Sequence, residues 1–257
     1  MTIHPTAIIS AKASIGERSE IGPYCRIGDC VTIGDDCRLD SHVVIEGPTT
    51  IGSHNRFFPF CVIGVQPQDL KYDGEETFLT IGSHNEFREY VNVHRGTAGG
   101  GAHTRIGDRN FLMVGAHIAH DCILGSHIIM ANAATLAGHV TIEDHATIGA
   151  YSGVHQYCRV GTHGYVGGYT VITKDVLPYS KTVSDRNTQA FGVNAIGLER
   201  KGFSNEQVQN IKAAFRLLTQ SKLNTSQAVE AIRQQALSPE VDVLLKFIES
   251  STRGVIK

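Results

Sequence analysis

Apolar side chains recur at every sixth position over most of the chain. They form a run of eleven, a run of three and a run of twelve, separated by two interruptions. The positions are Ile3, Ile9, Ile15, Ile21, Ile27, Ile33, Leu39, Ile45, Ile51, Phe57 and Ile63, then Ile81, Phe87 and Val93, then Ile106, Leu112, Ile118, Leu124, Met130, Leu136, Ile142, Ile148, Val154, Val160, Val166 and Ile172. A period of six fits neither a helix nor a simple alternating strand, but it suits short strands joined by tight turns. We therefore predict a parallel β-helix with three hexads, about 18 residues, in each coil.

Two other residue types follow the same period. Glycine comes directly after the apolar residue in twelve of the 26 hexads. Because glycine tolerates positive φ, we expect the turns to use that freedom at this position. Five of the six cysteines fall four residues after the apolar position; they are Cys25, Cys37, Cys61, Cys122 and Cys158. A small buried side chain would fit there, so we expect packing residues rather than redox or metal chemistry.

The pattern changes after Ile172. Residues 175–194, DVLPYSKTVSDRNTQAFGVN, are predicted to be an irregular connector. Beyond them, Ser204 and Gln207 suggest a capping box at the start of a helix, a second helix could begin at Ser226, and a third at Ser238 with Pro239 in its first turn. We expect a β-helix domain over 1–186, with loops near 64–80 and 94–105, and a helical domain over 187–257. The second domain could cover the open strand edges at one end of the stack.

Several histidines fall into common columns of this repeat. Residues about 18 apart should lie one above another at the strand spacing of about 4.8 Å. The columns are His120 with Gly138 and Gln156, Asp121 with His139 and Tyr157, and Ala119 with Ala137 and His155. If the loop after Val93 adds seven residues to the hexad pattern, His94 joins the last column. The columns therefore gather four histidines, an aspartate and a glutamine on one patch.

This patch suggests proton-transfer chemistry. Histidine exchanges a proton near neutral pH, with an unperturbed pKa of about 6.5, and a neighbouring carboxylate fixes its tautomer. No serine or cysteine stands out as a nucleophile there. We therefore expect direct transfer of an acyl group. A histidine would deprotonate the acceptor hydroxyl while the hydroxyl oxygen attacks the bound acyl group. The backbone N–H of Gly138, above His120, could stabilise the developing oxyanion.

Charge and shape narrow the class of partner. A formal net charge of -2 and a pI near 6.7 give no reason to expect nucleic acid or an anionic membrane. Neither a signal peptide nor a membrane-spanning stretch is recognisable, so we expect a cytoplasmic protein that does not span a membrane. A three-sided β-helix is convex and filled inside, so we expect copies to assemble into a cyclic trimer with substrate clefts between them.

Six short segments carry a family resemblance. In order, QDLKY, VHRGT, AHIAHDC, LAGHVTI, VHQYC and RKGFS, with a final STRG, closely resemble the UDP-N-acetylglucosamine 3-O-acyltransferases of lipid A biosynthesis. The resemblance covers essentially the whole chain. It implies an all-β left-handed parallel β-helix of hexapeptide repeats with a C-terminal α-helical domain, and a homotrimer. The left hand comes from the resemblance alone, because general rules for parallel crossovers favour the right hand.

The resemblance also implies a reaction and its residues. A (R)-3-hydroxyacyl group passes from acyl carrier protein to the 3-hydroxyl of UDP-N-acetylglucosamine. No metal or cofactor is implied, because phosphopantetheine arrives on the carrier protein. His120 is implied as general base, Asp121 as its orienting group and the Gly138 amide as oxyanion hole. The implied substrate contacts are Gln68, Asp69, Lys71, His94, His117, His139, His155, Gln156, Asn194, Arg200 and Lys201. Gly168 matches the position that limits acyl length, and a glycine there predicts a long chain.

Other interpretations stay open at this point. The acceptor could carry a 3-amine instead of a 3-hydroxyl. A zinc-dependent hydratase resembling the gamma carbonic anhydrases would need three histidines around an open metal position. A non-catalytic scaffold is a further possibility. The later N-acyltransferase of the same pathway should carry an added domain before the repeats, which here begin at Ile3. The segment SDRNTQAF also departs from the family in placing Asp185 and Arg186 before Asn187.

Overall fold

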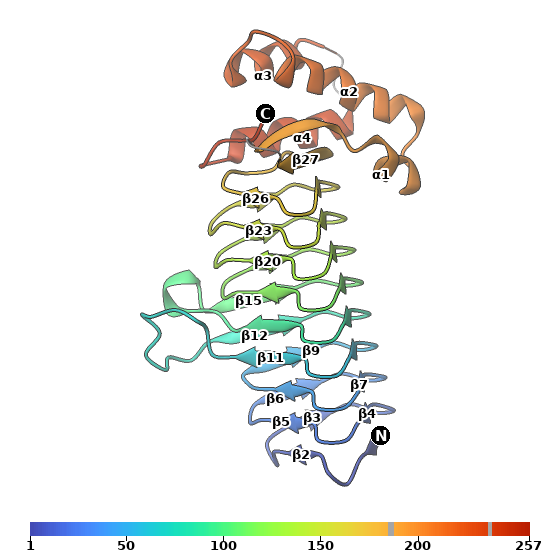
Figure 1. The fold of residues 1–257 in the computed structure, drawn as a ribbon, viewed down its shortest axis with the longest axis vertical. Helices are drawn as coiled ribbons and strands as arrows, with labels where there is room; N and C mark the ends of the chain where they lie inside the picture. The colour runs from blue at the N-terminus through green and yellow to red at the C-terminus, as the bar shows by residue number, and fades with distance from the viewer. Residues whose placement is uncertain (185–187, 236–237) are drawn as a thin grey trace.

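The repeat region winds into a three-sided stack of parallel coils. The computed structural model describes residues 1–184, 188–235 and 238–257. In Figure 1 the coils rise from the N-terminus to a group of helices at the other end. The prediction of a left-handed parallel β-helix with a C-terminal helical domain is confirmed.

Each side of the stack is one sheet. Sheet A has eleven strands among the described residues, sheet B nine and sheet C eight. Sheet A contains β1 (Thr2–Ile3), β4 (Glu20–Ile21), β7 (Arg38–Leu39), β10 (Arg56–Phe57), β13 (Glu86–Phe87), β16 (Phe111–Leu112), β19 (Ile129–Met130), β22 (Thr147–Ile148), β25 (Tyr165–Val166), β27 (Ser180–Ser184) and β28 (Thr188–Val193). Sheet B contains β2 (Ile8–Ile9), β5 (Arg26–Ile27), β8 (Val44–Ile45), β11 (Val62–Val65), β14 (Asn92–His94), β17 (His117–Ile118), β20 (Thr135–Leu136), β23 (Gly153–Val154) and β26 (Val171–Ile172). Sheet C contains β3 (Ser14–Ile15), β6 (Val31–Ile33), β9 (Thr49–Ile51), β12 (Phe78–Ile81), β15 (His103–Ile106), β18 (Ile123–Leu124), β21 (Thr141–Ile142) and β24 (Arg159–Val160).

The periodic apolar residues fill the interior of the coils. Of the 26 positions, only Ile3, Ile9 and Ile15 in the first coil are not buried. Like residues stack across coils, as where the rings of Phe57 and Phe87 lie 4.7 Å apart between centroids. The five periodic cysteines are buried and free, as predicted. Burial of this continuous apolar column is the main stabilising contribution to the stack.

The corners of the coils use glycine differently from the prediction. Positive φ occurs three residues after the apolar position, and non-glycine residues such as Tyr24 (φ 57°) and His42 (φ 59°) adopt it. Among the twelve glycines that follow an apolar residue, only Gly64 has positive φ, so that expectation is wrong. The reason for glycine is close approach between coils. A Cβ on Gly34 would lie 2.7 Å from the carbonyl carbon of Gly52.

Two excursions leave the stack at its corners and return in register. The first spans residues 66–77, between β11 and β12, and the second spans 95–102, between β14 and β15. They lie within the predicted loops near 64–80 and 94–105. Ile51 pairs with Ile81 and Ile81 with Ile106 across the longer coils, while β14 and β17 pair Val93 with Ile118. This last pairing confirms that His94 and Ala119 share a column.

The described residues of the predicted irregular connector include two strands, so that expectation is wrong for them. Strand β27 pairs in parallel with β25, and β28 then pairs antiparallel with β27. The edge of the last coil needs a hydrogen-bonding partner, and β27 supplies it. Strand β27 was not predicted because its buried side chains, Ser180 and Thr182, are polar and break the apolar pattern. Asp185, Arg186 and Asn187 lie outside the described residues.

The described residues also form four α-helices and one 3-10 helix. They are α1 (Ala195–Arg200), α2 (Asn205–Thr219), α3 (Thr225–Arg233), α4 (Pro239–Ser250) and η1 (Ala98–Gly100). The predicted capping box of Ser204 and Gln207 is present, and Pro239 follows the N-cap of α4. The predicted start at Ser226 is wrong, because Asn224 caps α3 and pairs with Gln227. A second apolar core lies among these helices and includes Leu177 from the connector.

No helix in the described part of the chain has the length and apolar character needed to cross a membrane.

Candidate active site

His120 and Asp121 form a hydrogen-bonded pair at the corner that follows β17. Asp121 occupies the positive-φ position of this corner, with φ 61°. The Nδ1 atom of His120 lies 2.8 Å from Oδ2 of Asp121. Since an ionised carboxylate only accepts hydrogen bonds, Nδ1 carries the proton in the neutral ring, and Nε2 of that ring keeps its lone pair. The side chain of His120 is 13% exposed and that of Asp121 only 1%. His120 is therefore a candidate base whose Nε2 is available to a substrate and whose Nδ1 is held by the buried Asp121.

Thr97 of the second excursion and Thr104 of β15 hold Asp121 in place. Thr97 donates its backbone N–H to Oδ1 at 2.9 Å and its hydroxyl to Oδ2 at 2.6 Å. Thr104 accepts the backbone N–H of Asp121 at 2.8 Å. Burial alone would raise the pKa of Asp121, but the hydrogen bonds from His120 and Thr97 outweigh it and lower the pKa below its ordinary value. Asp121 is therefore held ionised beside His120.

Gly138 lies directly over the His120 ring, as the columns predicted. A Cβ at Gly138 would lie 2.7 Å from Nε2 and 3.1 Å from Nδ1 of His120. Only glycine leaves room for the ring in this position. Within the described ranges, the Gly138 amide hydrogen has no acceptor, although the amides of Ala137 and His139 on either side are both bonded. A free backbone N–H thus lies beside the free nitrogen of the base.

Three further histidines of the predicted set line the same corner. The ring of His139 lies edge-on to that of His120, with 5.1 Å between centroids, and its Nδ1 is 3.9 Å from Oδ2 of Asp121. His94 and His117 pack in the same way at 5.0 Å, and Asn92 bonds Nδ1 of His117. His94 is buried, and its Nδ1 has no partner within the described part of the chain. These histidines are held at fixed orientations around the pair.

The possible ligand atoms at this corner do not form a three-histidine centre. Among the described residues, the one cluster of suitable metal-binding groups contains two histidines, His120 and His139, with Asp121. Oδ2 of Asp121 already receives the Thr97 hydroxyl and Nδ1 of His120. A metal ion would have to displace the hydrogen bond that orients His120. The donor set therefore fits a proton-transfer pair better than the zinc-hydratase alternative.

Buried histidines make the stability of this protein pH-dependent. Burial lowers the pKa of six of them, to about 4 in His94 and His163; the other four are His103, His117, His139 and His145. Below the unfolded value of about 6.5, the unfolded chain binds more protons than the folded one. We expect the free energy of unfolding, measured with urea, to be highest above about pH 6.5 and to decrease as the pH falls towards 4. His163→Gln should reduce this slope and His84→Gln, at an exposed turn, should not; equal slopes in all three proteins would contradict the assignment.

The first excursion carries the QDLKY segment over this corner. Asp69 lies close enough to raise the pKa of His139, although burial dominates and the net shift is downward. Gln68 and Lys71 are exposed, and Oδ1 of Asp69 accepts the backbone N–H of Lys71 at 2.9 Å. The two excursions are also tied together, because Arg95 donates to the Tyr72 hydroxyl at 3.3 Å. The loop therefore presents its polar side chains beside the histidines.

Other predicted residues lie at a greater remove from the pair. His155 and Gln156 are exposed one coil above Gly138, and Nδ1 of His155 lies 3.2 Å from the Gln156 carbonyl oxygen. Tyr157, from the next column position, stacks on His139 with 4.3 Å between ring centroids. Gly168 is exposed at a corner between sheets A and B, where a Cβ would meet only the Ala150 backbone, at 3.2 Å.

The remaining three predicted site residues line a cavity beside α1. Asn194, Arg200 and Lys201 line a space of about 660 Å³ whose other walls include strands of sheet A. His120 instead follows a strand of sheet B. One chain therefore holds the two predicted groups over different faces of the stack.

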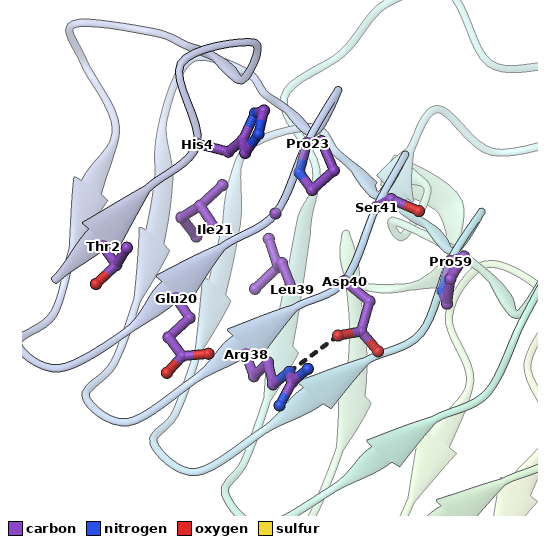
Figure 2. Close-up of a pocket in the computed structure, with 11 residues that line it drawn as sticks. Thr2, His4, Glu20, Ile21, Pro23, Arg38, Leu39, Asp40, Ser41 and Pro59 are labelled. Atoms are coloured by element: carbon purple, nitrogen blue, oxygen red, sulfur yellow. Dashed lines mark hydrogen bonds and ion pairs between the residues drawn. The ribbon is translucent and has the colours of Figure 1, made fainter.

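A second cavity, of about 460 Å³, lies on the first coils (Figure 2). There Nε of Arg38 donates to Oδ1 of Asp40 at 2.9 Å, below His4 and Pro23. None of the predicted site residues lines this cavity. It is not part of the site around His120.

Sequence reasoning missed the residues that hold the pair in place. Thr97 and Gly100 lie in the second excursion, whose length alone entered the prediction of the His94 register, and Thr104 lies in β15. The excursion itself was the available signal, because a segment inserted next to the column of His120 can supply contacts to that site.

Comparison with known proteins assigns the family. A family model described as Udp N-acetylglucosamine O-acyltransferase, domain 2, matches residues 175–256. The acyl-(acyl-carrier-protein)–UDP-N-acetylglucosamine O-acyltransferases of Thermodesulfovibrio yellowstonii and Syntrophobacter fumaroxidans are 46% identical over 256 residues and 48% identical over 258 residues. The alignments cover 99% of both chains in the first case and 100% in the second.

Solved structures agree with these relatives over the whole chain. LpxA from Acinetobacter baumannii is 45% identical, with a TM-score of 0.96 and complete coverage of both chains. The UDP-N-acetylglucosamine acyltransferase of Bacteroides fragilis is 41% identical, with a TM-score of 0.97 and the same coverage. Identity at this level over the full length, on the same fold, shows that the chain belongs to the acyl-(acyl-carrier-protein)–UDP-N-acetylglucosamine O-acyltransferase family of enzymes.

Proposed function

We propose that this enzyme transfers a (R)-3-hydroxyacyl group from acyl carrier protein to the 3-hydroxyl of UDP-N-acetylglucosamine, the first step of lipid A biosynthesis. The mechanism rests on the arrangement of His120, Asp121 and Gly138 at the corner after β17. A histidine with an anchored Nδ1 and an open Nε2 lies against a glycine whose amide hydrogen is free.

The transfer proceeds without a covalent acyl-enzyme. Nε2 of His120 removes the proton from the 3-hydroxyl as its oxygen bonds to the thioester carbonyl carbon. The negative charge that develops on the carbonyl oxygen is stabilised by the Gly138 amide. When the tetrahedral intermediate collapses, the C–S bond breaks and the pantetheine sulfur receives the proton that His120 holds. Asp121 stabilises the charged imidazole between these two steps. The cycle needs no metal or cofactor.

The family resemblance implies the substrate contacts, and the charge and position of these residues support them. Lys71, Arg200 and Lys201 are exposed cations suited to the diphosphate or to pantetheine phosphate. Asp69, Gln68 and Asn194 supply groups for the sugar and base. The histidines around the pair, with Gln156, shape the sugar and thioester site. The open surface at Gly168 supports a long acyl chain.

We also propose that the enzyme acts as a homotrimer in the cytoplasm. His120 and Arg200 lie over different faces of one chain, so a single substrate that meets both must bridge two copies. Each site would then combine His120 of one protomer with Arg200 of the partner subunit.

Mixing inactive variants tests this assembly. We expect His120→Ala chains and Arg200→Ala/Lys201→Ala chains each to be nearly inactive alone. Coexpression should restore activity, because mixed trimers contain sites with both groups intact. Mass photometry should give the mass of three chains. A monomeric mass, or no restoration in verified mixed oligomers, would contradict the shared site.

The decisive experiment for function follows the products of the reaction by mass spectrometry. Carrier proteins with 3-hydroxyacyl chains of several lengths are offered with UDP-N-acetylglucosamine or with its 3-amino analogue. We expect an ester with the hydroxyl acceptor and a preference for longer chains. Amide product with the 3-amino sugar alone would favour the alternative acceptor, and no product with either would refute the proposal.

A further inference from the structure

We propose that Thr97 and Gly100 form a cradle for the Asp121 carboxylate, and that Thr97 is a positioning residue for the His120–Asp121 pair. This inference rests on the catalytic role proposed for the pair. It adds a function for the second excursion, residues 95–102, which leaves the coil directly after His94.

Thr97 and Gly100 both lie against the carboxylate. Thr97 donates its N–H to both oxygens, at 2.9 Å and 3.1 Å, and its hydroxyl to Oδ2 at 2.6 Å. Gly100 of the same turn lies so close that a Cβ there would overlap the carboxylate atoms. The same oxygen that receives the Thr97 hydroxyl also bonds Nδ1 of His120. The position of Oδ2, and with it the orientation of the imidazole, therefore depends on Thr97.

The carboxylate needs such support because of where the backbone places it. Asp121 has positive φ, and its side chain is almost completely buried. A buried charge is costly unless it is hydrogen-bonded, and among the described residues the only hydrogen-bond donor to this carboxylate besides Thr97 is His120. Thr97 supplies two donors from a single residue.

The excursion is built to hold Thr97 rigidly. The carbonyl oxygen of Thr97 accepts the amides of Gly100 and Ala102, which closes the η1 turn. Glu75 of the first excursion accepts the amide of Ala98 at 3.3 Å. Thr97 itself is 5% exposed. The segment thus forms a small folded unit whose inner surface is the carboxylate site.

Replacing Thr97 with valine tests the hydroxyl with almost no change in shape. We expect kcat for acyl transfer to fall about 10- to 100-fold, with KM little changed, because a hydrogen bond to a charged group is lost at the base and not at the substrate. The acid limb of the kcat/KM profile should also move to higher pH, since Asp121, which faces His120 and His139, loses a group that favours its ionised form. Thr97→Ser keeps the hydroxyl and should retain near wild-type kcat and the wild-type limb.

Thr77 offers a matched control. It is also a buried threonine, but its hydroxyl has no partner within the described ranges. Thr77→Val should leave kcat and the pH profile unchanged. Equal loss in Thr77→Val and Thr97→Val would mean that any buried threonine in this region matters only for stability, and would overturn the proposal.

A second pair of variants probes the cradle without touching a hydrogen-bonding side chain. Gly100→Ala forces the carboxylate or the turn to move, whereas a Cβ on neighbouring Gly99 meets nothing within 4 Å. We expect Gly100→Ala to lose kcat at least as strongly as Thr97→Val and Gly99→Ala to behave as wild type. Thermal unfolding of all variants separates loss of the fold from loss of positioning.

His120→Ala distinguishes the two levels of the proposal. Wild-type activity in His120→Ala would refute the catalytic assignment itself. An inactive His120→Ala together with fully active Thr97→Val and Gly100→Ala would leave the assignment intact and refute the cradle.

Discussion

Replacement of His120 with alanine is expected to lower kcat for acyl transfer by about 10²- to 10⁴-fold, the usual range for loss of a general base. The imidazole is anchored at Nδ1 and open at Nε2, and within the part of the chain that the structure describes no other histidine at the corner combines these features with contact to Gly138. Because the ring is 13% exposed, its removal leaves a small, partly open space. The folded state should therefore persist, and product formation measured by mass spectrometry should report chemistry alone.

A histidine from another corner provides the comparison for this result. His84 lies at the positive-φ position of its own corner, is exposed and stacks on His54, far from Gly138 in sequence. His84→Ala should keep wild-type kcat. Activity in His120→Ala within a few-fold of wild type would show that the proton leaves the acceptor by another route.

Gly138→Ala is expected to lower kcat by about 10²- to 10³-fold, comparable to loss of an oxyanion-hole donor. The added methyl would lie 2.7 Å from Nε2 of His120, which is closer than a stable contact allows. Either the ring must turn away from its substrate-facing position or the Gly138 amide must shift. Both movements separate the base from the donor that stabilises the oxyanion.

Crystallography and kinetics of this variant together locate the effect. We expect the His120 ring to be displaced in Gly138→Ala, with the stack otherwise unchanged. Gly153, in β23 of sheet B, has no atom within 4 Å of its Cβ position, and Gly153→Ala should retain activity. An active Gly138→Ala with an undisturbed ring would remove Gly138 from the mechanism.

Much of this site could be predicted because a β-helix converts sequence spacing directly into spatial columns. Eighteen residues separate His120 from Gly138, and the two meet in the structure. The register of His94 followed from the length of one loop. Capping residues such as Ser204 likewise mark their helix from local hydrogen-bonding preferences.

The features that were not predicted depend on contacts between residues that do not share a column of the repeat. Thr97 reaches Asp121 from an excursion whose path is set by its own turn, so spacing could not place it. The role of glycine after the apolar residues was misjudged, because the collision is with the neighbouring coil and not within the turn. Strand β27 was missed since Ser180 and Thr182 bury hydroxyls where an apolar signal was expected.

The corner excursions also bear on how such an enzyme can diversify. A deletion of one or two residues within a coil would rotate every later side chain onto a wrong face, because pairing is counted in sixes. The two excursions do not disturb this register. Strand β12 pairs in register with both β9 and β15, although the intervening segments differ in length. The lengths of these two segments can therefore change without altering the register of the coils, provided that the contact between Thr97 and Asp121 is kept.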